Sequence, residues 1–165
     1  MKHKISLLWA WFVMLTLCWI PDFPLGMRFR GFLLGICMKH RGSDFQVAAG
    51  VRIKGLCYLS VGDHVYFANG VIVIAGKEVV IDDEVMLGPN VVVVDGNHTK
   101  VGSSYRFGKR SNKEVRIGRG AWIGAGVTIC AGSRVGEGAV VGANSVVVKD
   151  IPANVVAIGA PATPR

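Results

Sequence analysis

The second half of the sequence repeats with a period of six residues. An apolar residue stands at every sixth position, usually followed by glycine: Ile117, Ile123, Ile129, Val135, Val141 and Val147. A period of six is neither the 3.6 of an α-helix nor the alternation of a strand, and such short repeats are typical of a parallel β-helix. Each hexad is then expected to form one short strand and a corner, so that three hexads make a triangular coil. The apolar residues point inward and stack at the ~4.8 Å spacing of paired strands.

The same register occurs earlier in the chain, with interruptions. Apolar residues form two sets of three, separated by two extra residues: Val61, Phe67 and Val73, then Ile81, Leu87 and Val93. Val47, Ile53 and Leu59 are expected to form a degenerate first coil, as suits a terminal repeat that caps the stack. The alternative is a β-sandwich, whose strands alternate with period two and turn about every 8–12 residues. The unbroken spacing of six favours the β-helix, an all-β fold.

The N-terminal segment, residues 1–45, has a different character. Residues 5–20 carry no charge and include three tryptophans, and Pro21 is expected to end the helix that they form. Such a helix is ~24 Å long, shorter than the ~30 Å hydrocarbon core of a bilayer. Basic residues lie on both sides of it: Lys2, Lys4, Arg28, Arg30, Lys39 and Arg41. This pattern is typical of a helix that associates with a membrane interface.

Two other interpretations of residues 5–20 remain open. The helix can instead pack on the β-helix or on a neighbouring subunit. A cleaved signal peptide also begins with basic residues, although no small-x-small cleavage site follows here. The chain is thus expected to contain the N-terminal helical segment, a β-helix domain over 46–160 with an inserted loop at 95–114, and a tail at 161–165.

Composition excludes several classes of site. The four cysteines are scattered without a Cys-x-x-Cys pair or a Cys/His cluster, which predicts neither a metal site nor a disulfide framework and favours a reducing cytoplasmic setting. The net charge is +8, yet no nucleic-acid-binding motif occurs. The basic charge is therefore expected to meet lipid headgroups or an anionic ligand.

The repeat lapses between Val93 and Ile117, and this interval holds the best candidates for chemistry. It contains Asp95, Asn97 and His98, followed by a basic, polar stretch. A loop with a single histidine on a rigid scaffold is a common way to build a site, although loops are also tolerated insertions. A neutral imidazole can take a proton from an attacking hydroxyl or amine. Asp95 can fix the tautomer of His98, or it can serve only as a turn residue.

Two stretches resemble a known family. The sequence VRIGRGAWIGAGVTICAG, which begins at Val115, resembles the V-x-I-G-x-x-x-W-I-G-x-x-x-x-I motif of hexapeptide-repeat acetyltransferases. The sequence VGANSVVVKDIPANVVAIGAPA, which begins at Val141, resembles the C-terminal ending of the same family. His98 precedes Trp122 by 24 residues, as the catalytic histidine does in galactoside and maltose O-acetyltransferases. The resemblance implies a left-handed parallel β-helix, a homotrimer and the use of acetyl-CoA.

The resemblance also implies roles for individual residues. His98 is expected to be the general base that deprotonates an acceptor hydroxyl, which then attacks the thioester directly. Coenzyme A is expected in a groove between adjacent β-helices, where Ala125 and Ala143 match the family's contact positions, Val148 and Lys149 follow, and Trp122 packs in or beside the groove. The family often ends with one or two basic residues that help to bind the nucleotide, and this sequence departs from that ending, with only Arg165 available. Lys149 is equally explained as a solvated corner residue and Trp122 as a structural one. Asn69 and Asn97 are the expected acceptor-binding residues.

The apolar N-terminus resembles that of acetyltransferases from capsule, exopolysaccharide and lipopolysaccharide gene clusters. We therefore expect an acetyl-CoA-dependent O-acetyltransferase that acts on a saccharide or lipid-linked saccharide, peripheral at the inner face of the cell membrane. The same base and groove would also serve an N-acyltransferase of an amino sugar or a serine acetyltransferase, and a non-catalytic β-helix is a further alternative. A γ-type carbonic anhydrase needs three histidine ligands for zinc, whereas the β-helix domain offers only His64 and His98.

Overall fold

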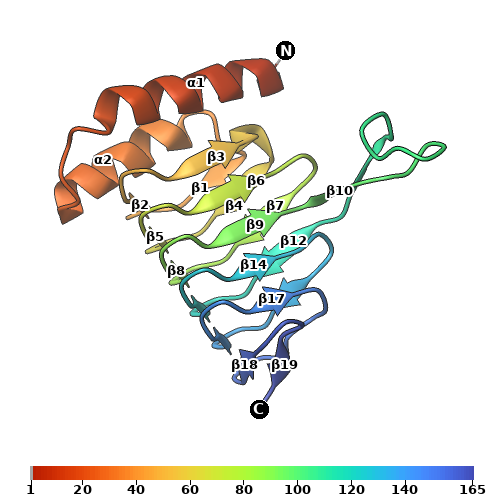
Figure 1. Cartoon of the computed structure of the whole chain (residues 1–165). Helices are drawn as coiled ribbons and strands as arrows, with labels where there is room; N and C mark the ends of the chain where they lie inside the picture. The colour runs from red at the N-terminus through yellow and green to blue at the C-terminus, as the bar shows by residue number, and fades with distance from the viewer. Residues whose placement is uncertain (1) are drawn as a thin grey trace.

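The computed structural model describes residues 2–165 and consists of a parallel β-helix with two α-helices across its N-terminal end (Figure 1). Short strands stack into three parallel sheets, which form the three sides of the coil. This architecture confirms the fold class predicted from the period of six.

The three sheets follow one another along each coil. Sheet A contains β1 (His40–Arg41), β4 (Leu59–Val61), β7 (Val79–Ile81), β12 (Val115–Ile117) and β15 (Arg134–Val135). Sheet B contains β2 (Gln46–Val47), β5 (Tyr66–Phe67), β8 (Met86–Leu87), β13 (Trp122–Ile123), β16 (Val140–Val141), β18 (Val156–Ile158) and β19 (Thr163–Pro164). Sheet C contains β3 (Arg52–Lys54), β6 (Ile72–Ile74), β9 (Val92–Val94), β14 (Thr128–Ile129) and β17 (Val146–Val147). Within each sheet the strands pair in parallel, except that β19 pairs with β18 in the antiparallel direction.

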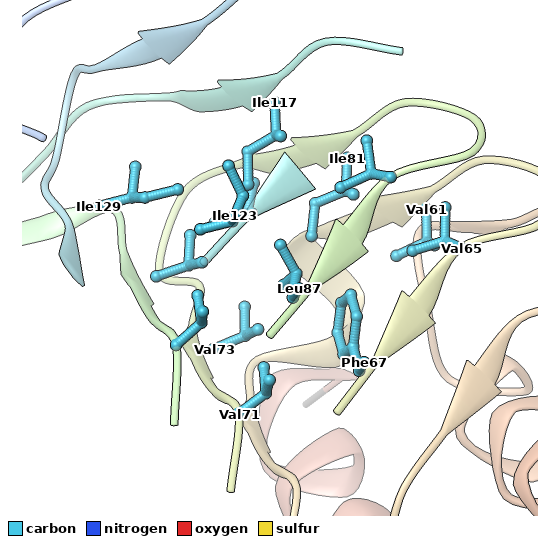
Figure 2. Packing of buried hydrophobic residues seen from close by; sticks show 14 of the residues in the cluster. Val61, Val65, Phe67, Val71, Val73, Ile81, Leu87, Ile117, Ile123 and Ile129 are labelled. Atoms are coloured by element: carbon cyan, nitrogen blue, oxygen red, sulfur yellow. The ribbon is translucent and has the colours of Figure 1, made fainter. Parts of the chain in front are cut away.

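The core is a set of apolar columns that run along the axis of the β-helix. Phe67 pairs in register with Leu87, which in turn pairs with Ile123, and all three side chains are fully buried. Figure 2 shows these residues with their counterparts from the other two sheets, all pointing into the interior. Each such side chain contributes about 1.5–3 kcal/mol through burial. The strict spacing of six therefore reflects a requirement that every coil fill the same interior position.

The first coil differs from its prediction in one member. Leu59 lies on the same strand as Val61, β4, and pairs with Val79 of the following coil. Both Leu59 and Val61 are buried, because residues two apart on a strand face the same side. The assignment of Leu59 to the first coil is therefore wrong, and β1 supplies that side of the first coil instead. A turn at Gly55 (φ +87°) and a short 3-10 helix, η1 (Leu56–Tyr58), take up the intervening residues.

The two helices close the N-terminal end of the β-helix. Helix α1 (Lys2–Leu17) packs against α2, β3 and η1, and α2 (Pro24–Gly35) packs against β2. Ala10 and Val13 of α1 are buried with Leu34 of α2. The predicted apolar helix thus has one face packed on protein, while its outer face exposes large apolar side chains: Ile5, Leu8, Trp11, Phe12 and Leu15. Within residues 2–165, no helix combines the length and apolarity that a bilayer crossing requires.

A buried arginine joins the helices to the first coil. The side chain of Arg30 is fully buried and donates hydrogen bonds to the Asp22 carboxylate (2.8 Å) and to the carbonyls of Val47 (3.0 Å) and Leu17 (3.2 Å). Asp22 also accepts a hydrogen bond from the N–H of Ala49 (2.8 Å). A buried charge is tolerated only when it is paired and hydrogen-bonded, and Arg30 meets both conditions.

Candidate functional site

A hairpin leaves the β-helix at the corner between sheets C and A. Strands β10 (Gly96–His98) and β11 (Arg110–Asn112) pair in the antiparallel direction, and the segment between them extends away from the coils (Figure 1). The hairpin is inserted after β9 of sheet C and before β12 of sheet A. It is therefore carried by strands that are held on both sides by neighbouring coils.

The root of the hairpin is fixed by a buried carboxylate. Asp95 is fully buried, and its carboxylate accepts hydrogen bonds from the backbone N–H groups of Gly76 (2.8 Å), Lys77 (2.6 Å) and Glu78 (2.9 Å) in the preceding coil. It also accepts a hydrogen bond from the side-chain amide of Asn112 (3.1 Å), the last residue of β11. One carboxylate thus ties both ends of the hairpin to the same corner of the coil before it.

This position corrects the role expected for Asp95. Its two oxygens are occupied by these donors, and no hydrogen bond joins Asp95 to His98 anywhere in the described part of the chain. The expectation that Asp95 fixes the tautomer of His98 is therefore wrong for the single chain. The structure supports the alternative, in which Asp95 holds a turn, and adds that this turn positions the hairpin.

His98 lies on the exposed part of the hairpin, where it pairs in register with Arg110. It lines an open hollow together with Asn97, Tyr105 and Arg106. The hollow therefore brings together an imidazole, an amide, a phenol and a guanidinium. Such a group of side chains can hydrogen-bond a hydroxylated ligand and accept a proton from it.

Sequence reasoning did not single out Tyr105 as a site residue. The signal was present, because an exposed tyrosine follows His98 within one polar insertion. The sequence alone does not show that the end of the insertion pairs with the segment that carries His98. The structure supplies that register through the pairing of β10 with β11.

The residues expected to contact the coenzyme or acceptor lie on two corners and one face of the β-helix. Ala125 and Ala143 are exposed on successive coils at the corner between sheets B and C, where the N–H of Asn144 donates to the carbonyl of Ala125 (2.8 Å). Asn69 lies at the same corner nearer the N-terminus, and its side-chain amide donates to the carbonyl of Ala49 (2.6 Å). Asn69 therefore stabilises the corner of the preceding coil.

Val148 and Lys149 lie at the other corner, between sheets C and A, on the side from which the hairpin emerges. Both are exposed. Trp122 is half exposed on the outer face of sheet B, in register between Met86 and Val140.

Arg165 follows β19 at the end of sheet B, where its N–H donates to the carbonyl of Val156 (2.8 Å). The strands of sheet C separate the two corners, so one chain alone does not bring His98 together with Ala125 and Ala143.

Several other charged side chains form ion pairs along the coils. Arg116 donates to both oxygens of Asp82 (2.8 and 3.1 Å), and Arg119 pairs with Glu84 (2.5 Å). These pairs lie at the solvent-exposed surface and contribute little to stability. Across residues 2–165, no three His, Cys, Asp or Glu side chains lie together as a metal site requires.

The repeats are similar to those of known proteins. The sequence profile described as bacterial transferase hexapeptide (six repeats) matches residues 114–149. A galactoside O-acetyltransferase from Lactococcus lactis subsp. lactis is 37% identical over 106 residues, which is 61% of this chain and 51% of that protein. The chain spans about half the length of the curated relatives it matches.

Solved structures agree over nearly the whole chain. A maltose O-acetyltransferase from Clostridium difficile 630 is 27% identical with a TM-score of 0.81, covering 99% of this chain and 86% of that one. A galactoside acetyltransferase in complex with coenzyme A is 26% identical with a TM-score of 0.86, covering 99% of this chain and 80% of that one. The resemblance noted from the sequence motifs is therefore confirmed.

Proposed function

We propose that this hexapeptide-repeat protein is an acetyl-CoA-dependent O-acetyltransferase that acts on a hydroxyl group of a saccharide. The observation that carries the proposal is the hairpin, which presents His98 in an open polar hollow on a scaffold similar to that of galactoside and maltose O-acetyltransferases. Two of the hollow's other side chains, Asn97 and Tyr105, offer hydrogen bonds suited to a sugar hydroxyl.

In this proposal His98 is the general base. Its neutral imidazole takes the proton of the acceptor hydroxyl while the oxygen attacks the thioester carbonyl carbon. A tetrahedral intermediate forms and collapses, the carbon–sulfur bond breaks, and the proton passes from His98 to the departing thiolate of coenzyme A. The products are an acetyl ester and free coenzyme A, and no covalent intermediate on the protein is required.

The proposed site is completed by a second copy of the chain. His98 and the corner with Ala125 and Ala143 lie at opposite ends of the sheet C strands, so each chain offers two half-sites. When β-helices pack side by side, the hairpin of one copy faces the alanine corner of the next. We therefore propose a homotrimer with coenzyme A in each groove between neighbours, a closed symmetry that gives every copy the same contacts.

We further propose that the protein works at the inner face of the cell membrane, in the synthesis of a surface polysaccharide. The supporting observation is the outer face of the N-terminal helices, where large apolar residues are exposed beside the basic residues Lys2, Lys4 and Arg28. Tryptophan and basic side chains together favour the interface of an anionic bilayer.

The decisive experiment follows release of free thiol from acetyl-CoA in the presence of a panel of saccharides. Wild type is compared with His98→Asn, which removes the base. The matched control is His64→Asn, since His64 is also exposed, and its positive φ of 56° is one that asparagine tolerates. We expect His98→Asn to lower kcat about 10²–10⁴-fold, the usual contribution of a general base, with oligomer size and coenzyme A binding unchanged. His64→Asn should retain activity.

Equal turnover by wild type and His98→Asn would refute the role of His98. Absence of coenzyme A binding by wild type would refute the acetyltransferase proposal as a whole. The product also distinguishes the bond formed, because an acetyl ester is cleaved by mild hydroxylamine whereas an amide persists. A hydroxylamine-resistant product would show N-acylation.

A further inference from the structure

An apolar groove lies between α1 and β3, at the N-terminal end of sheet C. One wall is formed by α1 through Leu7, Ala10, Trp11, Met14 and Leu15 with the adjacent Cys18, and the other by residues 50–54. The groove encloses about 680 Å³, within the range of small-molecule sites. Since α1 rises by 1.5 Å per residue, the wall from Leu7 to Cys18 is about 16 Å long. The groove is thus long and largely apolar.

Two cationic side chains lie on the β3 wall of this groove. Arg52 and Lys54 are both exposed, and within residues 2–165 neither forms an ion pair with an acidic side chain. Helix α1 itself contains no acidic residue. An apolar channel with unpaired cations on one wall matches an amphiphile with a hydrocarbon tail and an anionic head, because the tail is desolvated along α1 while arginine and lysine bind the head.

The register of sheet C connects this groove to the hairpin. Lys54 pairs with Ile74 on β6, and Ile74 pairs with Val94 on β9, after which Asp95 begins the root of the hairpin. Two strand spacings separate Lys54 from Val94, which is about 10 Å. An anionic head held at Arg52 and Lys54 therefore directs any attached group along sheet C toward the hairpin that carries His98.

We propose that the groove between α1 and β3 binds the hydrocarbon tail of a lipid phosphate, with Arg52 and Lys54 binding the phosphate, and that the acceptor saccharide is attached to this phosphate. The inference rests on the proposed function for the saccharide, but the binding of the lipid phosphate stands on the groove alone. The apolar N-terminal helix then has a specific role, because α1 forms one wall of the acceptor site.

The test measures binding of farnesyl phosphate by the full-length protein, with farnesol and inorganic phosphate as reference ligands. The charge variant is Arg52→Gln combined with Lys54→Gln. Its control, Arg119→Gln combined with Arg134→Gln, removes the same number of charges outside the groove. We expect the charge variant to lose about tenfold or more in affinity for farnesyl phosphate and to change little for farnesol, because the lost contacts are made by the phosphate.

A second pair of variants tests the apolar wall. Cys18→Trp places a large side chain in the groove, whereas Thr16→Trp adds the same side chain to an exposed position outside the lining. We expect Cys18→Trp to weaken binding of both farnesyl phosphate and farnesol, with Thr16→Trp similar to wild type. Circular dichroism of all variants establishes that the fold is retained.

Equal affinity of wild type and both groove variants for farnesyl phosphate would overturn the proposal, as would binding of inorganic phosphate as strong as that of farnesyl phosphate. A change of oligomer size in Cys18→Trp, without farnesyl phosphate binding to wild type, would show that a second copy covers the groove and would also overturn it. Acetyl transfer to soluble saccharides is assayed separately. Farnesyl phosphate binding without acetyl transfer would support the lipid-phosphate site and overturn both the proposed function and the attachment of an acceptor saccharide. Acetyl transfer without farnesyl phosphate binding would support the proposed function and overturn the lipid-phosphate site.

Discussion

Replacing Asp95 by asparagine tests the assignment of this carboxylate to the root of the hairpin. The side chain keeps its size and one carbonyl oxygen, but it loses its charge, and one oxygen becomes an NH₂ group. In the native protein the carboxylate accepts hydrogen bonds from the N–H groups of Gly76, Lys77 and Glu78 and from the amide of Asn112. After the change, the new NH₂ group faces N–H donors from which the carboxylate oxygen accepted hydrogen bonds in the native protein.

The expected loss follows from the number of these bonds. A hydrogen bond to a charged group contributes about 1.5–3 kcal/mol and one between neutral groups about 0.5–1.5 kcal/mol, so weakening four bonds costs about 4 kcal/mol before compensation. Release of the desolvation cost of a buried charge offsets part of this. We therefore expect Asp95→Asn to lower the free energy of unfolding by about 2–3 kcal/mol. Asn112→Ala, which removes only the 3.1 Å bond, should cost about 1–2 kcal/mol.

Urea unfolding at a fixed protomer concentration measures both losses, provided that the slope with urea is unchanged between variants. The pH dependence of kcat for acetyl transfer is the second readout. Because Asp95 acts on the position of the hairpin, Asp95→Asn should lower kcat without moving the pH at which activity is half-maximal. A stability change below about 0.5 kcal/mol together with a displaced pH profile would refute this reasoning, because Asp95 would then act directly on the proton affinity of His98.

Three further predictions concern the rest of the chain. Arg30→Met should lower the free energy of unfolding by about 1–3 kcal/mol in urea titrations, since it leaves the buried carbonyl of Val47 without this donor and removes the cation that pairs with the exposed Asp22 carboxylate. Phe67→Ala should cost about 3–5 kcal/mol in the same assay, because Phe67 is fully buried and packs edge-on against Phe45 with ring centroids 5.0 Å apart. The hydrogen bond from Arg28 holds the pKa of Asp44 below its usual value of 3.8, so Asp44 stabilises the fold above that pH and the contribution is lost as the pH falls through the folded-state pKa. The stability difference between wild type and Asp44→Asn should therefore shrink as the pH is lowered from about 5.

The repeat determined the fold from sequence because the physical requirement is local. Each inward residue must fill the same space as its counterpart one coil away, as Ile117 and Val135 do, so the spacing reveals the coil without any knowledge of long-range contacts. The same reasoning failed at Leu59, where a spacing of six from Ile53 occurs by coincidence. Strand β4 has three residues and places two side chains, Leu59 and Val61, inward. The period of six alone does not show which of the two belongs to the repeat.

The site was less predictable because its residues obey no period. His98 was identified by its place in the insertion and by resemblance, whereas the partner of Asp95 depends on which turn of the preceding coil lies beneath it. The corner of Gly76 and Lys77 is two residues longer than an unbroken hexad allows, and these extra residues supply the N–H groups that bind the carboxylate. The sequence shows that the repeat is interrupted here, but only the structure shows that the extra residues bind Asp95.

The groove beside α1 also lies next to a part of the chain that does not follow the repeat. The hairpin and α1 both lie where the chain departs from the period of six, the hairpin as an insertion and α1 as a segment before the first coil. Sheet C connects them through strands in strict register, so the regular part of the chain sets the separation between the two irregular parts. A change in the number of strands between β3 and β9 would alter that separation in steps of about 4.8 Å. In this proposal the β-helix is a spacer between the lipid-phosphate site and the histidine, and the number of strands from β3 to β9 would set the length of acceptor that reaches His98.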